Sequence, residues 1–430
     1  MQRALSYDQA PPLPVALKFF LGAPLFLFAA SLLLLWHGPA AIESRWSPVT
    51  LALTHLLTLG FVSMAMIGAL LHILPVVIGV TLPVRRLTAS VLHAALTAGT
   101  LSLAGAFLSS QAVLFRLALA LLVPTFLWLL GCLTIALSRK ALPKPEATTA
   151  SIRLAVMALA VTILLGASMA GALAWGYPVP FMLLTDLHVL WGLGGWVGLV
   201  IIGVAFQLVP MFQVTQVYPM DIKRLLSGSL FLLLVLWSTE AILEAPVVTR
   251  VLSAAMFLTL ASFAIATLYL LNRKKRAKPD ASAPFWRLSM TSLLLCGVVW
   301  ATQFATGDHP PVLTLGVLFI VGFAGTLING MLYKIVPFLI WYHAQLNARP
   351  GVRTIPGVRD LVPDHATAGQ FRAHLVALLL LTAATVLPDM LARPAAIAMC
   401  ISSGWLLHNL LRAVRVFTRS EQNALAVISP

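Results

Sequence analysis

Apolar and polar residues are distributed along the chain in long blocks. Runs of about twenty apolar residues, each long enough to cross the hydrocarbon core of a bilayer as a helix, recur from one end to the other. Short polar gaps separate the runs, so we expect a chain of twelve membrane helices. Their predicted ranges are 16–36, 50–76, 87–109, 112–138, 151–175, 181–212, 222–245, 248–272, 284–305, 311–341, 369–388 and 393–418.

Composition supports the same class of protein. Hydrophobic residues make up 60% of the chain and charged residues only 10%, which excludes a water-soluble globular protein with one buried core. The sequence therefore predicts an all-α polytopic membrane protein whose main partner is the lipid bilayer. We expect residues 1–430 to form a single membrane domain.

Positively charged residues are concentrated in the segments on one side of the membrane. The formal net charge is +15, and 23 of the 28 Lys and Arg residues fall in the terminal segments, in the gaps after even-numbered helices, or in the helix ends that adjoin them. Basic residues mark cytoplasmic segments, so this alternation places both termini in the cytoplasm. The longest cytoplasmic gap, 342–368, contains Pro350, Gly351 and Pro363 and is expected to be a loop. A nucleic-acid partner is not expected.

One motif occurs three times. In the second helix, Gly60-Phe61 is followed by Gly68, His72 and Pro75. The sixth and tenth helices carry the same residue types at the same offsets, 135 and then 127 residues farther on; their members are Gly195-Trp196, Gly203, Gln207 and Pro210, and Gly322-Phe323, Gly330, Lys334 and Pro337.

This repeat indicates three units of four helices. The units cover roughly residues 16–138, 151–272 and 284–418 and predict a ring with pseudo-threefold symmetry. The two glycines of each motif lie on nearly one helix face about 12 Å apart, where they admit either a neighbouring helix or a flat ligand. Each proline is expected to end or kink its helix.

Twelve helices arranged as three units of four, with this motif in the second helix of each unit, resemble subunit I of the haem–copper oxidase superfamily. Thr54-His55 leading to Gly60-Phe61, Gly68 and Pro75 is similar to the NnrS-like family within it. A second stretch, Asp186-Leu187-His188 through Gly195-Trp196-Val197, resembles the sixth-helix signature of oxidase-like membrane proteins. The resemblance implies an oxidase-like fold in a bacterial inner membrane and a haem ligated by His55 near the outer face.

The sequence also departs from the oxidase pattern. By the repeat offset, the two haem-ligand histidines of the tenth helix would fall at Leu315 and Val317, neither of which binds a metal. The seventh helix contains no histidine, so the paired copper ligands are missing as well. We therefore do not expect oxygen reduction by the oxidase mechanism, and whether the protein is an enzyme stays open.

His55 and His188 begin helices that the repeat places in equivalent positions, so they are expected to point toward the centre at similar depth. Neutral imidazole is a common ligand of haem iron and of copper, which makes both residues candidate cofactor and metal ligands. The alternative is that each imidazole is satisfied by a backbone carbonyl or by Asp186.

A second group of polar residues lies toward the cytoplasmic side. We interpret it as a candidate inner polar cluster for a second haem or a proton path; its members are His72, His93, Gln207, Lys334, His374 and His408. The alternative is that they are interfacial side chains, and Lys334 in particular is expected to reach toward the lipid headgroups.

The leading hypothesis is a haem-binding membrane protein, with copper as a further candidate cofactor. By resemblance it would bind a diatomic gas or exchange electrons with a partner protein in nitric oxide, nitrosative-stress or respiratory metabolism. One alternative is a twelve-helix transporter, because carriers also contain repeats and helices broken by Gly and Pro. Another is an oxidase-like scaffold or assembly protein without cofactors.

Overall fold

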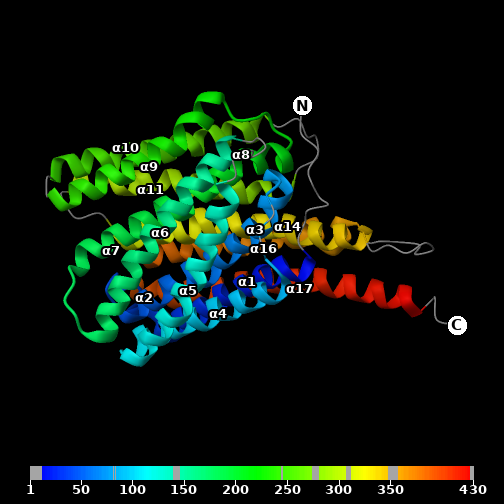
Figure 1. Ribbon diagram of the computed structural model, residues 1–430, viewed down its shortest axis with the longest axis horizontal. Coiled ribbons are helices and arrows are strands. Elements are labelled where there is room, and N and C mark those ends of the chain that lie inside the picture. Colours follow the sequence, from blue (N-terminus) through cyan, green and yellow to red (C-terminus); the bar gives the residue numbers. More distant parts are fainter. Residues whose placement is uncertain are drawn as a thin grey trace.

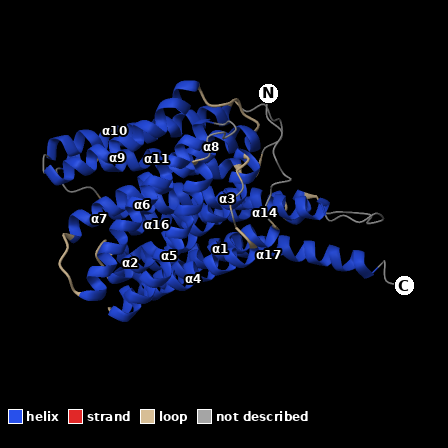
Figure 2. Ribbon diagram, viewed as in Figure 1, coloured by secondary structure: helices blue, strands red, loops and turns tan. Residues whose placement is uncertain are grey.

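The fold is a bundle of twelve long helices. The computed structural model describes residues 12–80, 82, 84–138, 146–243, 246–273, 280–306, 311–346 and 357–426. Every regular element in these ranges is helical (Figure 2). Twelve of the helices are long and apolar enough to cross a membrane, which confirms the predicted number, and we call them spans 1 to 12 in chain order.

Nine spans consist of a single long helix, and a short 3₁₀ helix, η2 (Gly38–Ile42), extends span 1. Spans 1, 3, 4, 5, 7, 8, 9, 11 and 12 are formed by α1 (Leu13–His37), α4 (Arg86–Ser109), α5 (Ala112–Leu137), α6 (Glu146–Trp175), α9 (Met220–Leu243), α10 (Pro246–Asn272), α11 (Ala283–Ala301), α16 (Asp364–Ala384) and α17 (Pro388–Ala426).

Spans 2, 6 and 10 are composite, because each changes from α-helix to π-helix and back. Span 2 is α2 (Pro48–His55), η3 (Leu56–Ser63), α3 (Met64–Ile73) and η4 (Leu74–Ile78); span 6 is α7 (Phe181–Val189), η5 (Leu190–Gly198) and α8 (Leu199–Gln213); span 10 is α13 (Val312–Val317), η6 (Leu318–Gly325) and α14 (Thr326–Leu346). Two short helices, α12 (Gln303–Thr306) and α15 (Val358–Leu361), lie between spans.

Several helices are longer than the apolar pattern predicts. Helix α14 continues to Leu346, so the predicted loop 342–368 is too long at its start. No proline or glycine follows Phe338 until Pro350, and the helix therefore has no reason to end at the edge of the apolar run. Residues 347–356 of that loop lie outside the described residues. Helix α17 likewise begins at Pro388, five residues before the predicted start of span 12.

The spans run side by side, and both described ends of the chain lie at the same end of the bundle (Figure 1). We call this end the basic face, because Arg86, Lys223 and Arg273 lie there. The opposite face carries the turns after α1 and α6. Trp36 and Trp175, which are 83% and 60% exposed, lie at that face. Exposed tryptophans at helix ends are typical of a membrane–water interface.

Spans 2, 6 and 10 form the inside of the bundle. Buried residues make up 78%, 67% and 61% of their most apolar stretches, against 28–56% in the other nine spans. Their π-helical segments meet, because η6 contacts both η3 and η5. The three spans that carry the sequence motif are therefore the three that the other helices surround.

The π-helical segments occupy the same place in each motif. They begin at Leu56, Leu190 and Leu318, four or five residues before the first glycine of the motif. A π-helical segment is rare and costs hydrogen-bond geometry, so its recurrence at one position in three spans shows that the motif specifies backbone shape as well as side chains.

The glycines of the motif are contact points with the preceding span. A Cβ atom built at Gly60 would lie 2.3 Å from the ring of Phe26, and one built at Gly330 would lie 2.6 Å from the Cβ of Phe285. The six glycines pack against pairs of residues seven apart in spans 1, 5 and 9: Gly60 and Gly68 against Phe26 and Phe19, Gly195 and Gly203 against Ala158 and Ser151, Gly322 and Gly330 against Ser292 and Phe285. Of the two expected uses of these glycines, the structure shows the close approach of a neighbouring helix.

The prolines of the motif act differently from one another. The helix with Pro75 ends three residues later, where Gly79 adopts a left-handed conformation with φ 73°. The helix with Pro210 ends at Gln213. Helix α14 instead continues nine residues past Pro337, so this proline does not end its helix.

The first glycine of span 2 provides a test of this packing. Replacing Gly60 with Ala should lower the free energy of unfolding by about 1–3 kcal/mol, because the new methyl group overlaps the Phe26 ring. The control is Gly228→Ala in α9, where a Cβ atom meets nothing within 4 Å and the better helix former should be neutral or stabilising. Thermal unfolding in detergent compares the two; equal midpoints would contradict the packing.

Candidate metal centre

His55 and His188 lie where two central spans change helix type. His55 is the last residue of α2, and η3 begins at the next residue. His188 lies in the last turn of α7, two residues before η5. Both side chains are half-buried and both belong to the half of the bundle nearer the opposite face. The motif that shapes spans 2 and 6 therefore also places these two histidines.

The structure brings the two imidazoles together. Their ring centroids are 6.4 Å apart, and the ring planes differ by 24°. Two metal–nitrogen bonds of about 2.0–2.1 Å, with the ring radii added, give a centroid separation of about 6.3 Å for one metal held between two Nε2 atoms. The observed separation is thus compatible with a shared metal.

The hydrogen bonds of the pair fix which ring nitrogen is free. Nδ1 of His55 lies 2.8 Å from the Leu51 carbonyl oxygen, and Nδ1 of His188 lies 3.0 Å from that of Thr162. A carbonyl only accepts, so each Nδ1 carries the proton and each Nε2 keeps its lone pair. No described group bonds to either Nε2. A backbone carbonyl on the other ring nitrogen is the usual support of a histidine that ligates a metal.

A glycine makes room for one of the rings. A Cβ atom at Gly166 of α6 would lie 2.8 Å from Cε1 of His188. On the other side of the pair, the Phe107 ring of α4 lies 5.2 Å from the His55 ring, at an angle of 29°. Phe107 of span 3 and Gly166 of span 5 therefore flank the histidine pair. Sequence reasoning missed Gly166, because it lies outside the repeated motif.

The alternative partner Asp186 is engaged elsewhere. Its Oδ1 accepts a hydrogen bond from Nη1 of Arg45 at 2.8 Å. The other alternative, a backbone carbonyl, does apply to both histidines, but it occupies only one nitrogen of each ring. The carbonyls orient the imidazoles and leave one ligand atom on each.

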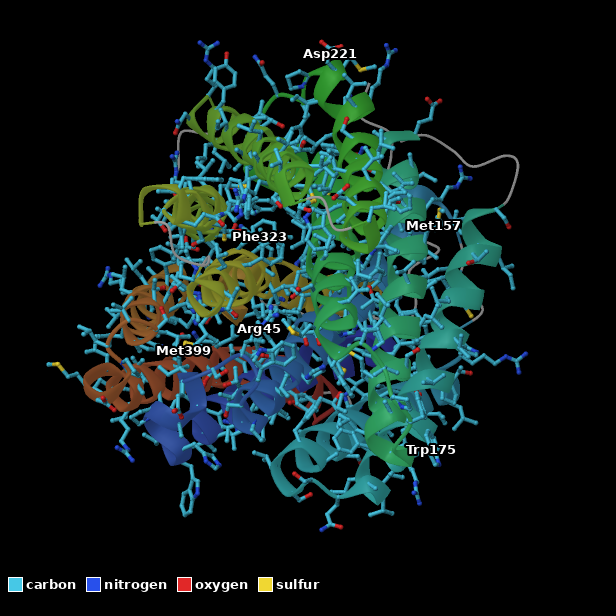
Figure 3. The ribbon with its side chains drawn as sticks, turned by 90° about the vertical axis from the view of Figure 1, so that its left-hand side faces the viewer. Arg45, Met157, Trp175, Asp221, Phe323 and Met399 are labelled. Atoms are coloured by element: carbon cyan, nitrogen blue, oxygen red, sulfur yellow. The ribbon has the colours of Figure 1, made fainter. Side chains whose placement is uncertain are left out.

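An apolar cavity of about 410 Å³ lies between spans 2, 6 and 10, but neither His55 nor His188 lines it, because their rings pack against spans 3 and 5. Leu51 and Thr54 line it within one helical turn of His55, and Thr185 and Val189 line it within one turn of His188. Binding sites for cofactors and small molecules are of this size and character. Arg45 also lines the cavity, and it lies near the middle of the bundle when the opposite face is viewed end-on (Figure 3).

The tenth span closes this cavity with apolar side chains. Leu315 and Val317, at the two positions singled out by the repeat offset, both line it. Span 10 therefore contributes shape and no ligand atom at these two positions. Within the described ranges, no three His, Cys, Asp or Glu side chains gather into a metal site.

The six residues of the predicted inner cluster are not joined to one another by hydrogen bonds or ion pairs in the described part of the chain. His72 is buried, Gln207 is half-buried, and His408 is exposed on α17. His93 lies against Gly22, and its Nε2 is enclosed with no described hydrogen-bond partner.

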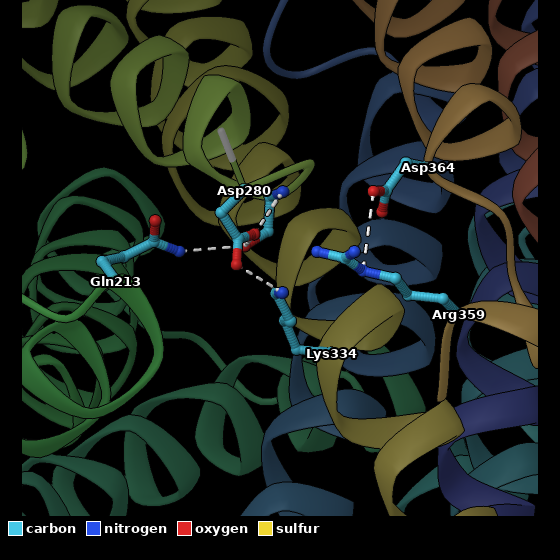
Figure 4. Close-up of polar contacts among 6 residues, drawn as sticks. Gln213, Asp280, Lys334, Arg359 and Asp364 are labelled. Atoms are coloured by element: carbon cyan, nitrogen blue, oxygen red, sulfur yellow. Dashed lines mark hydrogen bonds and ion pairs between the residues drawn. The ribbon is translucent and has the colours of Figure 1, made fainter. Parts of the chain in front are cut away.

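Lys334 belongs to an ion pair that the sequence did not reveal. Its Nζ donates to Oδ2 of Asp280 at 2.5 Å, and only 2% of the Asp280 side chain is exposed (Figure 4). Ser282 donates to Oδ1 of Asp280 through its backbone N–H at 2.8 Å and its hydroxyl at 2.7 Å, and Nε2 of Gln213 donates to that hydroxyl oxygen at 2.9 Å. Lys334 is thus paired with a carboxylate of the segment between spans 8 and 9, and the expectation that it reaches toward the lipid headgroups stays a prediction. Asp280 lies just beyond a run of basic residues, which concealed its role.

His374 has both ring nitrogens engaged. Its Nε2 lies 2.8 Å from Oγ1 of Thr326, and its Nδ1 lies 3.3 Å from Nδ2 of Asn329. Thr326 also donates to the Val321 carbonyl oxygen at 3.1 Å, so the hydroxyl must accept from Nε2–H of His374. With no free lone pair on either nitrogen, His374 is not placed as a metal ligand.

Comparison with known proteins gives no further assignment: neither the protein-family models nor the curated proteins yield a match to this sequence. The chemistry of the site is therefore inferred from its own geometry and from the motif resemblance.

The Lys334–Asp280 pair gives a prediction for stability and pH. Burial raises the pKa of the Asp280 carboxyl, but hydrogen bonds from Lys334 and Ser282 and the positive charge of Lys334 outweigh burial and hold that pKa below its usual value. Replacing Lys334 with Met should cost about 1–3 kcal/mol at neutral pH, because a buried carboxylate loses its cation but the Lys334 side chain is 26% exposed and solvent weakens the pair.

This contribution should depend on pH in one direction. Because the pKa of Asp280 is lower in the folded protein, the stabilisation is complete above the unfolded value of about 3.9 and is lost as pH falls through the folded value. Unfolding midpoints of wild type and Lys334→Met should converge in acid. A difference that stays constant down to that range would contradict the ion pair.

Proposed function

We propose that this chain is a haem-binding membrane protein in which His55 and His188 are the ligands. The observation that carries the proposal is the pair itself: two imidazoles 6.4 Å apart, each with Nδ1 on a backbone carbonyl and Nε2 free. The energetic cost of placing polar histidines in apolar surroundings is recovered when they bind a metal.

Haem fits the donor set better than a bare ion does. A structural zinc site needs about four protein ligands, whereas a haem iron needs only one or two because the macrocycle supplies four nitrogens. The pair has no third His, Cys, Asp or Glu ligand among the described residues. Neither histidine lines the apolar cavity of about 410 Å³ between spans 2, 6 and 10, so the support for haem comes from the pair and not from that cavity. Copper, completed by a ligand from outside the chain, is the second candidate.

When bound, haem would supply a metal that carries electrons or binds a diatomic gas. The chain's own residues decide between these uses. If both imidazoles held the group, electron exchange with a partner protein would be favoured; if only one held it, a gas such as nitric oxide would have a place. The resemblance to NnrS-like proteins supports a role in nitric oxide, nitrosative-stress or respiratory metabolism.

We also propose the architecture that the resemblance implies, three units of four helices around a pseudo-threefold axis. Three observations support it. The π-helical segments recur at one position of the motif. The glycine contacts recur with the same spacing between spans 1 and 2, 5 and 6, and 9 and 10. Neighbouring units would also meet alike, because span 4 contacts span 5, span 8 contacts span 9 and span 12 contacts span 1.

A carrier is the second candidate function, and the cavity between spans 2, 6 and 10 favours it. Its lining is largely apolar, with Arg45 among the lining residues, so the cargo would be an apolar molecule with one polar end. A scaffold without cofactors is the remaining alternative, supported by Leu315 and Val317. Both alternatives predict that the purified protein contains no haem, and the following experiment tests for haem.

The haem prediction is tested by spectroscopy. The protein purified from membranes with ample haem should show a Soret band and about one haem per chain. His55→Ala and His188→Ala should remove or shift that band, because each loses an Nε2 ligand. Gly166→Ala should also perturb it, because the new methyl group would displace the His188 ring.

The control for these variants is His408→Ala, which removes an exposed imidazole and should leave the spectrum unchanged. Wild-type protein without haem or copper would overturn the proposal. So would a Soret band that both histidine variants retain unaltered.

We propose further that the basic face is cytoplasmic in a bacterial inner membrane, as the positive-inside rule requires. Single cysteines at exposed positions test this in a background without Cys132, Cys296 and Cys400. A membrane-impermeant maleimide on cells with a permeabilised outer membrane should label Glu43→Cys at the opposite face and spare Ser138→Cys at the basic face. The reverse pattern would show that the orientation is wrong.

A further inference from the structure

A line of buried polar side chains runs between spans 10, 11 and 12. Near the basic face, Nδ2 of Asn409 donates to the Tyr333 hydroxyl oxygen at 2.9 Å and to the Ala366 carbonyl oxygen at 3.4 Å. One turn farther along α16, Nε2 of Gln370 donates to Oγ of Ser402 at 3.1 Å and to the Ser402 carbonyl oxygen at 3.2 Å.

The line ends at His374, one more turn along α16. Ala366, Gln370 and His374 are four residues apart and share one helix face, so the three positions cover about 12 Å. His374 is 1% exposed and contacts Thr326 and Asn329 of α14. We call this line, with its members Tyr333, Asn409, Gln370, Ser402, Asn329, Thr326 and His374, the polar seam.

Two acceptor atoms of the polar seam have no partner within the described structure. They are Oε1 of Gln370 and Oδ1 of Asn329, and both side chains are 0% exposed. An unsatisfied buried polar atom costs about 1–3 kcal/mol, and a buried water molecule is the usual remedy. Two such atoms, on Gln370 and on the Asn329 that contacts His374 one turn along α16, are places where water molecules can donate.

We propose that the polar seam holds water and that His374 is a proton-binding site in the membrane interior, reached from the basic face. The site does not depend on the histidine pair or on any haem, because the seam lies between spans 10, 11 and 12 and shares no residue with that site.

The hydrogen bonds around His374 accommodate both of its protonation states. In the neutral ring, Nε2–H donates to Thr326 and Nδ1 accepts from the Asn329 amide nitrogen. When a proton arrives at Nδ1, this atom becomes a donor and needs an acceptor. The Asn329 amide supplies one by rotating its unpartnered Oδ1 toward the ring, so neither state leaves Nδ1 unpaired.

No charged side chain competes for this proton. Of the titratable groups on the surrounding helices, Tyr333 is in the seam, and Lys334 of α14 is paired with Asp280. His343 of α14 is half-buried, with Nδ1 2.9 Å from the Leu339 carbonyl oxygen. The remaining groups near the basic end of α16 and α17 are exposed: Asp364, His365 and Arg372 on α16, and His408, Arg412 and Arg415 on α17. Helix α13 and segment η6, which also contact α16, carry no titratable residue.

Exchange of the imidazole C2 hydrogen for deuterium tests the proposal on the full chain in detergent. The reaction proceeds through the protonated ring and needs water, and mass spectrometry reports every histidine separately. His374 should exchange at a measurable rate with a sigmoidal dependence on pH, although it is 1% exposed. Absence of exchange at His374 would overturn the proposal.

The route is tested by closing the seam. Gln370→Leu removes an acceptor and fills the space with an apolar side chain, so exchange at His374 should slow about tenfold. The control is Ser403→Ala: Ser403 is equally buried but bonds only to carbonyls of its own helix, so exchange at His374 should not change.

His72 serves as an internal standard for folding in each variant, because it is buried on span 2 away from the seam. If a changed exchange rate at His72 shows that Gln370→Leu is misfolded, Ser402→Ala is measured instead. This variant should also slow exchange at His374. Equal rates at His374 in wild type and in the folded seam variant would refute the route.

Discussion

The close approach of spans 2, 6 and 10 to the spans before them is the constraint on which the structure depends. Pairs of glycines accept the side chains of residues seven apart on spans 1, 5 and 9, and a Cβ atom at Gly60 or Gly330 would overlap its neighbour. Lipid provides no hydrophobic driving force between helices, so packing of this kind must hold them together. The glycines thereby place three helices in the interior and leave the other nine around them.

The candidate site follows from this arrangement. The motif imposes a π-helical segment directly after His55 and two residues after His188, and the inward position of both spans brings the imidazoles within 6.4 Å. Backbone carbonyls then set the tautomer, and Gly166 makes room for one ring. The same stretches of sequence thus specify the backbone shape and the position of the two histidines, which explains why the pair lies beside the repeated motif.

Much of the fold could be predicted from the sequence, because in a membrane hydropathy alone decides where helices lie. The number of spans and the identity of the three special helices follow from apolar runs and repeated offsets. The ends of the helices could not be predicted in the same way. An apolar run ends where the chain leaves the hydrocarbon core, whereas a helix continues until a residue such as Pro or Gly interrupts it, as α14 shows. Partners far apart in the chain, such as Lys334 with Asp280 and His374 with Asn329, depend on tertiary contacts that one sequence does not display.

The most direct test of the central claim is a count of the imidazoles bound to the protein's metal. Electron spin-echo spectroscopy of the purified protein resolves nitrogen couplings from coordinated histidine. The account predicts two histidines on one metal in the wild type and one in either single variant, His55→Ala or His188→Ala. A protein that contains no metal, or one whose nitrogen couplings are unchanged in both variants, would contradict it.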